Sequence, residues 1–209
     1  MMARPTLMID LQRCIGCMSC VVACKMENGI PTGTTLTKIE SVGPVGTFPK
    51  NLKQYWFPQG CMHCDFPLCV PACPVSATFM RADGLVVIDP AICLGCDYCV
   101  VACPYGARSI EPASNKAVKC NLCAQLIDDG KLPSCVKHCM AQARFFGDLD
   151  DPDNEIARHI NKPGNQSRKF YILEDKGTKP TVAYLEPKCG MIVNDVSTLL
   201  GLAGPMKRP

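Results

Sequence analysis

Four blocks of four cysteines constrain this chain of 209 residues more than any other feature of its sequence. Blocks one and three share the spacing C-x2-C-x2-C-x3-C, in CIGCMSCVVAC and CLGCDYCVVAC. Blocks two and four keep the first pair and the final C-x3-C, but their middle is longer by two and by nine residues. Block by block, these sixteen of the 17 cysteines are Cys14, Cys17, Cys20, Cys24; Cys61, Cys64, Cys69, Cys73; Cys93, Cys96, Cys99, Cys103; and Cys120, Cys123, Cys135, Cys139. Such repetition implies that one kind of site is built several times.

The repeated spacing predicts 4Fe–4S clusters rather than zinc ions. Three closely spaced thiolates can bind three irons of one cubane, while the fourth cysteine of the run ligates a different cluster, as in bacterial two-cluster ferredoxins. A structural zinc site takes four ligands, usually as two pairs, and has no use for a third cysteine so close to the second. Blocks two and three also end in Cys-Pro, at Cys73-Pro74 and Cys103-Pro104, as the bacterial ferredoxin run does. Zinc is therefore the weaker alternative.

A disulfide framework is another use of many cysteines, and the sequence disfavours it. Disulfide scaffolds are typically secreted chains of fewer than about 100 residues with a signal peptide. The N-terminal MMARPTLMID has no apolar signal region, and no stretch reaches the ~18 uncharged apolar residues of a membrane-spanning helix. We expect a soluble chain without an export signal of its own.

The charge and the missing motifs limit what else the chain can do. The formal net charge of +3 counts every thiol as neutral, and four oxidised clusters at about −2 each would bring it to about −5. The sequence has no basic stripe with aromatic platforms, which argues against nucleic acid. It also has no Gly-rich phosphate loop or dinucleotide fingerprint. We expect no catalytic residue and no small-molecule substrate on this chain.

Exchange of the fourth cysteine between blocks predicts the ligands of each cluster. Blocks two and three are neighbours that both end in Cys-Pro, so they are predicted to form one module, with blocks one and four paired around it. The predicted ligands are Cys14, Cys17, Cys20 and Cys139 for cluster A; Cys24, Cys120, Cys123 and Cys135 for cluster B; Cys61, Cys64, Cys69 and Cys103 for cluster C; and Cys73, Cys93, Cys96 and Cys99 for cluster D. Because every ligand is cysteine and the clusters lie in close pairs, one-electron transfer is favoured over substrate chemistry or a purely structural role.

The segments between the blocks predict an α+β fold of the ferredoxin kind. The expected elements are a strand at Thr6–Asp10, β-hairpins within 77–89 and 107–119, short helices after Cys24, Cys73, Cys103 and Cys139, a helix near 154–160, and a third hairpin from 169–173 and 181–185. We expect two ferredoxin-like double-cluster modules: an outer one from residues 1–24 and 107–150 and an inner one from 61–106. Residues 25–60 would be an insertion and 151–209 a C-terminal extension for subunit docking.

Several polar residues near the ligands have two interpretations. The cations among them could offset cluster charge and raise reduction potentials, or form a solvated rim; they are Arg13, Lys25, Arg108, Lys119 and Lys137. His63 and His138 could donate hydrogen bonds to cluster sulfurs, or simply pack beside them. We expect Tyr98 and Tyr105 to pack, and Cys189 to be a free, inert thiol.

The order and spacing of the blocks, with the x11 gap in the fourth, resemble the four-cluster iron–sulfur subunits of the dimethyl sulfoxide reductase family of molybdopterin oxidoreductases. The resemblance covers about residues 5–160. The stretches PVSATFMRADGLVVID, CLGCDYCVVACPYGAR and FFGDLDDPDNEI look most like the tetrathionate, polysulfide, thiosulfate and arsenate reductase subunits.

This resemblance implies a non-catalytic electron-transfer (beta) subunit of a prokaryotic, membrane-associated complex for anaerobic respiration. It would pass single electrons between a catalytic subunit, with molybdenum or tungsten on a bis-pterin guanine dinucleotide cofactor, and a quinone-interacting membrane anchor. The complex would face the cytoplasm, or the chain would be exported with its partner. The alternative is the electron-transfer subunit of a hydrogenase or formate system, or a free-standing polyferredoxin.

Overall fold

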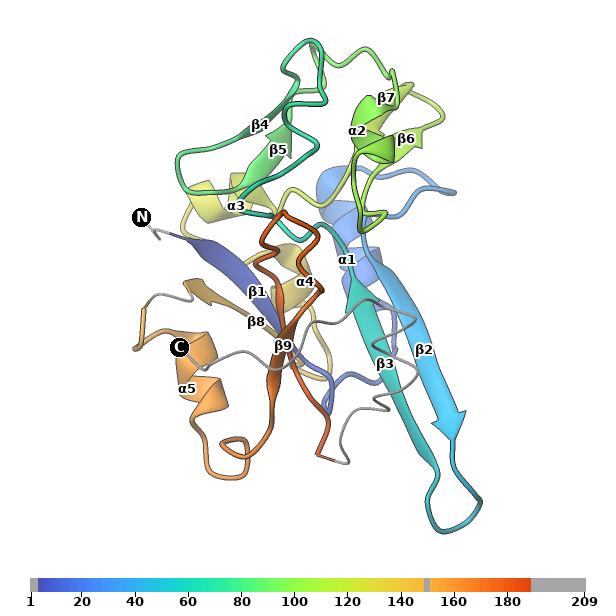
Figure 1. Cartoon of the computed structure of the whole chain (residues 1–209), viewed down its shortest axis with the longest axis vertical. Helices are drawn as coiled ribbons and strands as arrows, with labels where there is room; N and C mark the ends of the chain where they lie inside the picture. The colour runs from blue at the N-terminus through green and yellow to red at the C-terminus, as the bar shows by residue number, and fades with distance from the viewer. Residues whose placement is uncertain (1–3, 149–150, 189–209) are drawn as a thin grey trace.

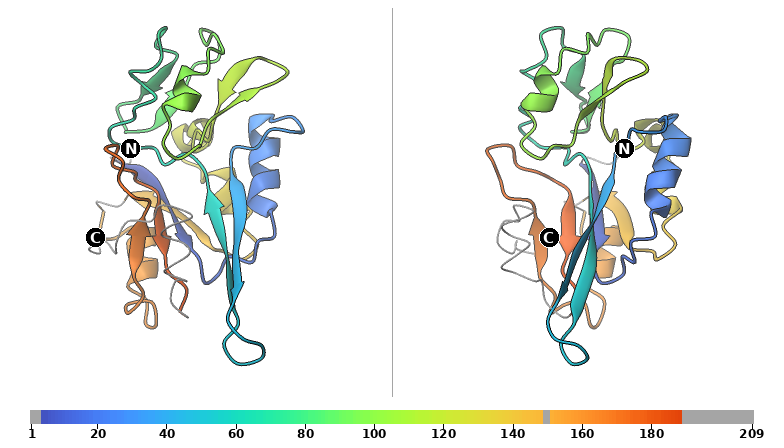
Figure 2. Two further views of the ribbon diagram at one scale, coloured as in Figure 1. Left: turned by 45° about the vertical axis from the view of Figure 1, so that its right-hand side comes forward. Right: turned by 90° about the vertical axis from the view of Figure 1, so that its right-hand side faces the viewer.

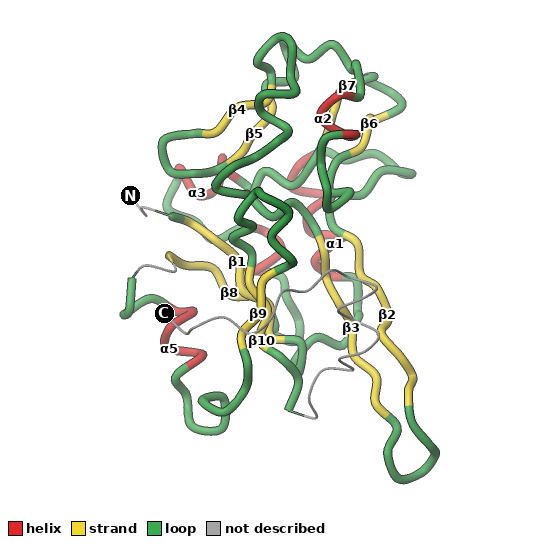
Figure 3. Tube along the Cα trace, in the orientation of Figure 1, coloured by secondary structure: helices red, strands yellow, loops and turns green. Residues whose placement is uncertain are grey.

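A central sheet organises the fold, which mixes helices and strands as the sequence predicts (Figure 1). The computed structural model describes residues 4–148 and 151–188. The sheet has four strands in the order β8-β1-β10-β9, drawn in yellow in Figure 3. The strand β1 (Pro5–Asp10) is antiparallel to β8 (Arg144–Asp148) and parallel to β10 (Ala183–Leu185), and β10 is antiparallel to β9 (Phe170–Ile172). The sheet therefore joins segments from both ends of the chain.

The two faces of this sheet pack against different parts of the molecule. Side chains alternate along a strand, so Met8 and Phe145 face the helix α5 (Glu155–Ile160) and form one apolar cluster with it. On the opposite face, Phe146 and Tyr184 belong to a second cluster that also contains cysteines of blocks one and four. The predicted helix near 154–160 is confirmed, with Asn154 as its N-cap. The sheet thus separates α5 from the cysteine blocks.

Two hairpins and a short helix gather at one end of the molecule (Figures 1 and 2). The first pairs β4 (Thr78–Met80) with β5 (Val86–Ile88), and the second pairs β6 (Ser109–Glu111) with β7 (Lys116–Val118), both antiparallel. The helix α2 (Tyr98–Val101) lies beside them. Both predicted hairpins are confirmed, and this end of the molecule carries blocks two and three.

A longer hairpin projects from the other end of the molecule (Figure 2). It pairs β2 (Lys38–Val45) with β3 (Lys53–Gln59), with an irregularity between Val42 and Val45. Phe57 anchors the hairpin because its buried ring stacks on Tyr184 of the central sheet, with ring centroids 4.4 Å apart. Phe48 at the tip is 82% exposed.

The helices around the blocks differ from the prediction that they follow the fourth cysteine. Instead, α1 (Ser19–Asn28) contains both Cys20 and Cys24, whereas α2 and α4 (Ser134–Lys137) contain the third cysteine of their blocks and end before the fourth. The turn after Cys73 is not helical. The C-x3-C spacing is about one helical turn, so that turn lies between the third and fourth cysteines of a block. Where a proline follows the fourth cysteine, it also disfavours the helical conformation at that cysteine. The helix α3 (Ala124–Asp128) lies in the long middle of block four.

The predicted strands near 169–173 and 181–185 are confirmed as the antiparallel pair β9 and β10. They do not stand apart as a tail hairpin, because β10 pairs directly with β1, Met8 opposite Ala183 and Ile9 opposite Tyr184. Cys189 lies outside the described residues.

Candidate iron–sulfur sites

The C-x2-C turn has the same local conformation in all four blocks. The residue just before the second cysteine has a positive φ each time: 67° at Gly16, 42° at His63, 70° at Gly95 and 56° at Leu122. This left-handed conformation suits glycine and costs a side-chain-bearing residue about 1–2 kcal/mol. Its recurrence at His63 and Leu122 gives all four turns the same local backbone shape.

Gly16 shows how tightly one of these turns is packed. A Cβ atom at this position would lie 2.3 Å from the indole of Trp56 in β3. Gly16→Ala should therefore destabilise the protein by about 3 kcal/mol, through backbone strain and overpacking together. Anaerobic urea unfolding would measure this. Gly84→Ala is the matched control, because Gly84 also has a positive φ but no atom within 4 Å of the added methyl. Equal losses in the two variants would contradict a packing role for Trp56.

All sixteen block cysteines are described and carry free thiols. Fourteen of them are buried or partly buried, and the two exposed ones are Cys17 in block one and Cys96 in block three. The thiols therefore face mainly inwards, where hydrophobic clusters surround them.

The first group of thiols combines block one with the last cysteine of block four. A small cavity is bounded by Cys14, Cys17, Cys20 and Cys139. Burial raises the pKa of the Cys14 thiol, and the negative charges of Cys20 and Cys139 raise it further. Cys139 accepts a hydrogen bond from a backbone N–H, that of Ala143, at 3.2 Å.

The second group combines block four with the last cysteine of block one. Burial raises the pKa of Cys24 to about 12, with Cys135 and Cys123 as the next causes. Cys120 is partly buried, and its pKa is raised by burial and then by Cys135 and Cys24. The side-chain amide of Asn28 reaches both Cys24 and Cys123, at 3.7 and 3.9 Å. Cys24 thus lies with block four although its own block is elsewhere in the sequence.

The third and fourth groups are at the other end of the molecule. Burial raises the pKa of Cys64 to about 12, and the charges of Cys61, Cys103 and Cys69 add to the effect. In the fourth group, Cys93 and Cys99 are buried in one hydrophobic cluster, and Cys73 packs against it. Thiols with such raised pKa values are protonated at neutral pH and must release protons when they bind iron.

Electrostatic effects and shared apolar packing link neighbouring groups of thiols. Cys20 of the first group acts electrostatically on Cys135 of the second, and Cys61 of the third acts on Cys120 of the second. Cys69 of the third group shares a hydrophobic cluster with Cys93 and Cys99 of the fourth. These links connect the groups in pairs, the first with the second, the second with the third and the third with the fourth. The exposed Cys17 and Cys96 belong to blocks one and three.

Two of the five predicted cations are buried among the thiols. Arg108, 6% exposed, donates to the sulfur of Cys69 at 2.9 Å and to the hydroxyl of Thr78 at 3.0 Å. Lys119, 5% exposed, donates to the carbonyls of Val86 and Cys120. Hydrogen bonds and charges of this kind tune iron–sulfur potentials.

The other three predicted cations have different roles. Lys25 donates to the carbonyl of Pro31 at 2.7 Å, and Lys137 is exposed. Arg13 bonds to Gln142 and lies 5.9 Å above the ring of Phe145. The sequence missed Arg144, a buried arginine that donates to the sulfur of Cys135 at 3.7 Å. The sequence signal that could have indicated Arg144 is a lone arginine at the start of an apolar segment, ARFFGD.

The two histidines of the blocks differ from each other. His138 is exposed, and its Nδ1 contacts the carbonyl of Ser134, which favours a local role. His63 is buried; its Nδ1 accepts from the N–H of Val86 at 3.2 Å, and its Nε2 has no protein partner. Burial, then the charges of Lys119 and Arg108, hold the pKa of His63 well below its usual value. Because Nδ1 accepts a hydrogen bond, a neutral His63 would carry its proton on Nε2.

The two tyrosines also differ. Tyr98 is 62% exposed beside block three. Tyr105 donates to the carbonyl of Glu174 at 2.9 Å and contacts the hydroxyl of Thr178 at 2.8 Å, so it ties the loop after Cys103 to the C-terminal segment.

The donor set fits 4Fe–4S clusters. Each group supplies cysteine sulfur, the ligand that iron–sulfur clusters use. Two buried donors without a protein partner, Nη2 of Arg144 and Nε2 of His63, belong to side chains among these thiols, and such donors normally have an acceptor. The described residues hold no group of three Cys, His, Asp or Glu side chains suited to a single metal ion.

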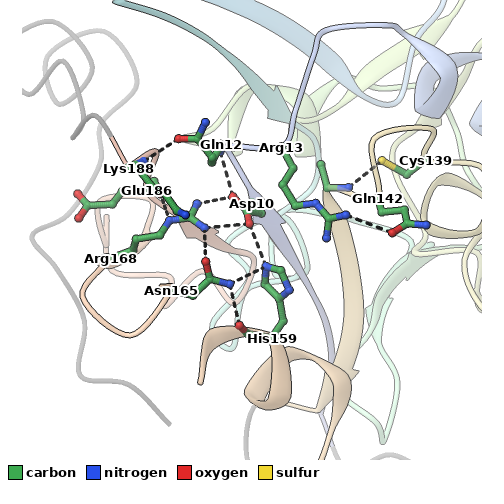
Figure 4. A network of polar contacts seen from close by, with 11 residues as sticks. Asp10, Gln12, Arg13, Cys139, Gln142, His159, Asn165, Arg168, Glu186 and Lys188 are labelled. Atoms are coloured by element: carbon green, nitrogen blue, oxygen red, sulfur yellow. Dashed lines mark hydrogen bonds and ion pairs between the residues drawn. The ribbon is translucent and has the colours of Figure 1, made fainter. Parts of the chain in front are cut away.

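A buried ion pair supports the turn that leads into block one (Figure 4). The carboxylate of Asp10, at the end of β1, accepts hydrogen bonds from both terminal nitrogens of Arg168, Nη1 and Nη2. It also lies 2.9 Å from Nε2 of His159. Asp10 also accepts from the backbone N–H of Gln12, and its carbonyl accepts from the N–H of Cys14. Burial alone would raise the pKa of Asp10, but the bonds with His159 and Arg168 outweigh it and hold that pKa at about 2.

Two family models together cover all four cysteine blocks. A model of the 4Fe-4S dicluster domain matches residues 52–149, which contain blocks two to four. A model of a 4Fe-4S binding domain matches residues 5–26, which contain block one. The chain thus contains ferredoxin-like 4Fe–4S domains.

Relatives match nearly the whole chain. The B subunit of tetrathionate reductase from Salmonella typhimurium is 41% identical over 97% of this chain and 78% of its own length. The chain belongs to the iron–sulfur electron-transfer subunits of the dimethyl sulfoxide reductase family of molybdopterin oxidoreductases. The B subunit of sulfite dehydrogenase from Allochromatium vinosum is 38% identical to this electron-transfer protein, over 99% of this chain and 93% of its own. The B subunit of selenate reductase from Mesobacillus selenatarsenatis is 35% identical, over 86% of this chain and 70% of its own. The family predicted from the block spacing is confirmed.

Each of these relatives is the B subunit of an enzyme, which implies a catalytic partner for this electron-transfer protein. In the described residues, no helix is both long and apolar enough to cross a membrane.

Proposed function

We propose that this electron-transfer protein holds four 4Fe–4S clusters, with one cysteine of each site supplied by another block. The proposed ligands are Cys14, Cys17, Cys20 and Cys139 (site A); Cys24, Cys120, Cys123 and Cys135 (site B); Cys61, Cys64, Cys69 and Cys103 (site C); and Cys73, Cys93, Cys96 and Cys99 (site D). The observation that carries this proposal is the position of Cys24, whose thiol lies among Cys123 and Cys135. The cavity shared by Cys139 and block one supports the reciprocal exchange.

The count of four has separate support from the backbone. If only two blocks bound clusters, the other two would have no reason to keep left-handed residues before their second cysteine. His63 and Leu122 keep that conformation although neither is glycine, and its cost persists only where the surrounding structure requires it.

A 4Fe–4S cluster with four cysteine ligands supplies one-electron transfer. The chain's own contribution would be to hold the sites in the order A–B–C–D. The electrostatic effects of Cys20 on Cys135 and of Cys61 on Cys120, and the apolar cluster shared by Cys69 and Cys93, support this order. Electrons would pass along this row, entering at one end site and leaving at the other. The exposed thiols of Cys17 and Cys96 make the end sites the natural contact points.

The proposed sites divide the chain into two double-cluster modules. Sites A and B use residues 1–24 and 107–150, and sites C and D use residues 61–106. The insertion 25–60 and the extension 151–209 would contribute docking surfaces in addition to their packing on the modules. The β2–β3 hairpin, with its exposed Phe48, is the most prominent part of the insertion (Figure 2).

The partners follow from the family. One end of the row would dock on a catalytic subunit that holds molybdenum or tungsten, and the other on a quinone-interacting membrane anchor. Both ends have exposed apolar side chains suited to docking. They are Ile15, Met18, Val22 and Met26 near Cys17, and Ile92, Leu94, Tyr98 and Val101 near Cys96. The assembled complex would lie at a prokaryotic membrane.

Anaerobic purification of the complex through this chain tests the proposal. We expect about 16 irons per chain, four for each cubane, together with a large subunit that contains molybdenum or tungsten. About eight irons would contradict the count of four clusters. Iron without either partner metal would favour a hydrogenase-type subunit or a free-standing carrier.

A further inference from the structure

Arg144 lies where sites A and B meet. It is the first residue of β8, paired with Ile9 of β1, and its side chain is on the face of the sheet that carries Phe146 and the cysteine blocks. Its Nη1 donates to the sulfur of Cys135 in site B at 3.7 Å. The same arginine also lines the cavity bounded by the four cysteines of site A. One guanidinium group therefore faces both sites.

The electrostatics of Arg144 agree with this shared position. The guanidinium keeps its positive charge although the side chain is buried. That charge acts electrostatically on Cys14 in site A and on Cys24 in site B. With 6% of the residue exposed, water screens little of this interaction.

One donor of the guanidinium has no protein acceptor. The atom Nη2 of Arg144 is buried and makes no hydrogen bond. An unmade hydrogen bond is more costly on a buried charged group than on a neutral one. Because Nη1 already donates to Cys135 and the side chain lines the cavity of site A, we expect the acceptor of Nη2 to be a sulfur atom of the cluster at that site.

We propose that Arg144 is a shared tuning residue that raises the reduction potentials of clusters A and B together. The inference rests on the proposed ligand sets of these two sites. Each reduction adds one electron and makes or breaks no bond at Arg144, so the effect is electrostatic. A fixed positive charge in a region of low dielectric favours the more negative, reduced state of a nearby cluster. The same charge stabilises the reduced state of both clusters, so it raises their two potentials together.

Arg108 provides the contrast within the same chain. It donates to Cys69 of site C and to the hydroxyl of Thr78, so both of its terminal nitrogens have partners. Its action should concentrate on one cluster, whereas that of Arg144 is divided between two.

The experiment is a redox titration of the intact complex, followed by electron paramagnetic resonance, for wild type and Arg144→Gln. We expect the reduction equilibrium constants of clusters A and B each to fall about tenfold, which is about 59 mV for a one-electron couple. Clusters C and D should keep their potentials. Arg158→Gln, an exposed arginine on α5, is the matched control and should change none of the four. Arg108→Gln should lower the potential of cluster C.

The outcomes separate this inference from the proposed ligand sets. A fall at only one of clusters A and B, or at neither, overturns the shared role of Arg144 while the iron content stays at the wild-type level. Wild-type complex with fewer than four clusters overturns the ligand sets themselves. If Arg144→Gln does not fold, Arg144→Lys keeps the charge without the guanidinium fork. It should lower both potentials by a smaller amount, and a shift of one alone or of neither overturns the proposal.

Discussion

Cys24→Ala should remove the same cluster as Cys135→Ala, and a different cluster from the one that Cys14→Ala removes. The thiol of Cys24 lies with Cys123 and Cys135 because it is one turn further along α1 than Cys20, a displacement of about 6 Å along the helix. Each variant should lose about four irons per chain. In the proposed order of sites A–B–C–D, the loss of any cluster should also abolish electron transfer from end to end. No substitution outside the ligands should have so large an effect.

Iron analysis and low-temperature electron paramagnetic resonance of each variant complex would measure this result. Cys24→Ala and Cys135→Ala should lack the same signal and keep the one that disappears in Cys14→Ala. Cys189→Ala, a cysteine outside the four blocks, is the matched control and should keep all the iron. A shared deficit in Cys24→Ala and Cys14→Ala would mean that each block binds a cluster with its own four cysteines, and it would falsify the exchange.

The sequence predicted the family and the local elements well because both depend on short-range spacing. The hairpins at Thr78–Ile88 and Ser109–Val118 follow from turn residues and alternating apolar residues a few positions apart. The pairing of β1 with β10 does not, since Met8 and Ala183 are far apart in the sequence. Nothing local in either strand indicates which partner it will find.

The tuning residues were partly predictable for the same reason. Arg108 lies a few residues after Cys103 in the sequence, so proximity alone suggested it. Arg144 acts on Cys20 and Cys135, and only the alternation of side chains along β8 directs it to them. The positions of the helices differ from the prediction for another reason. The C-x3-C spacing is itself a helical turn, so α2 and α4 end before the fourth cysteine of their blocks and do not follow it.

Asp10→Asn should destabilise the protein by about 3 kcal/mol, because it breaks a buried ion pair and leaves one partner charged. Asp10 is 1% exposed and Arg168 is 5% exposed. An asparagine would turn its NH2 group towards donors on Arg168 or His159, where the carboxylate has an acceptor for each. The turn that leads to Cys14 depends on the same residue, so site A should lose its iron first on heating. Urea unfolding under anaerobic conditions would measure the change. Asp128→Asn, at an exposed ion pair with Arg81, should change stability little.

The pH dependence distinguishes the charge of Asp10 from its shape. The pKa of Asp10 is about 2 in the folded protein, below its ordinary value of 3.8. The charged carboxylate therefore stabilises the folded state at every pH at which Asp10 is also ionised in the unfolded chain. That contribution is fully present above pH ~4 and is lost as the pH falls towards ~2. The stability difference between wild type and Asp10→Asn should therefore be constant from pH 8 to pH 5 and shrink only below pH 4. A difference that already changes between pH 8 and pH 5 would have to come from another titrating group. In that case the ion pair with Arg168 would not be what holds the turn before Cys14 in place.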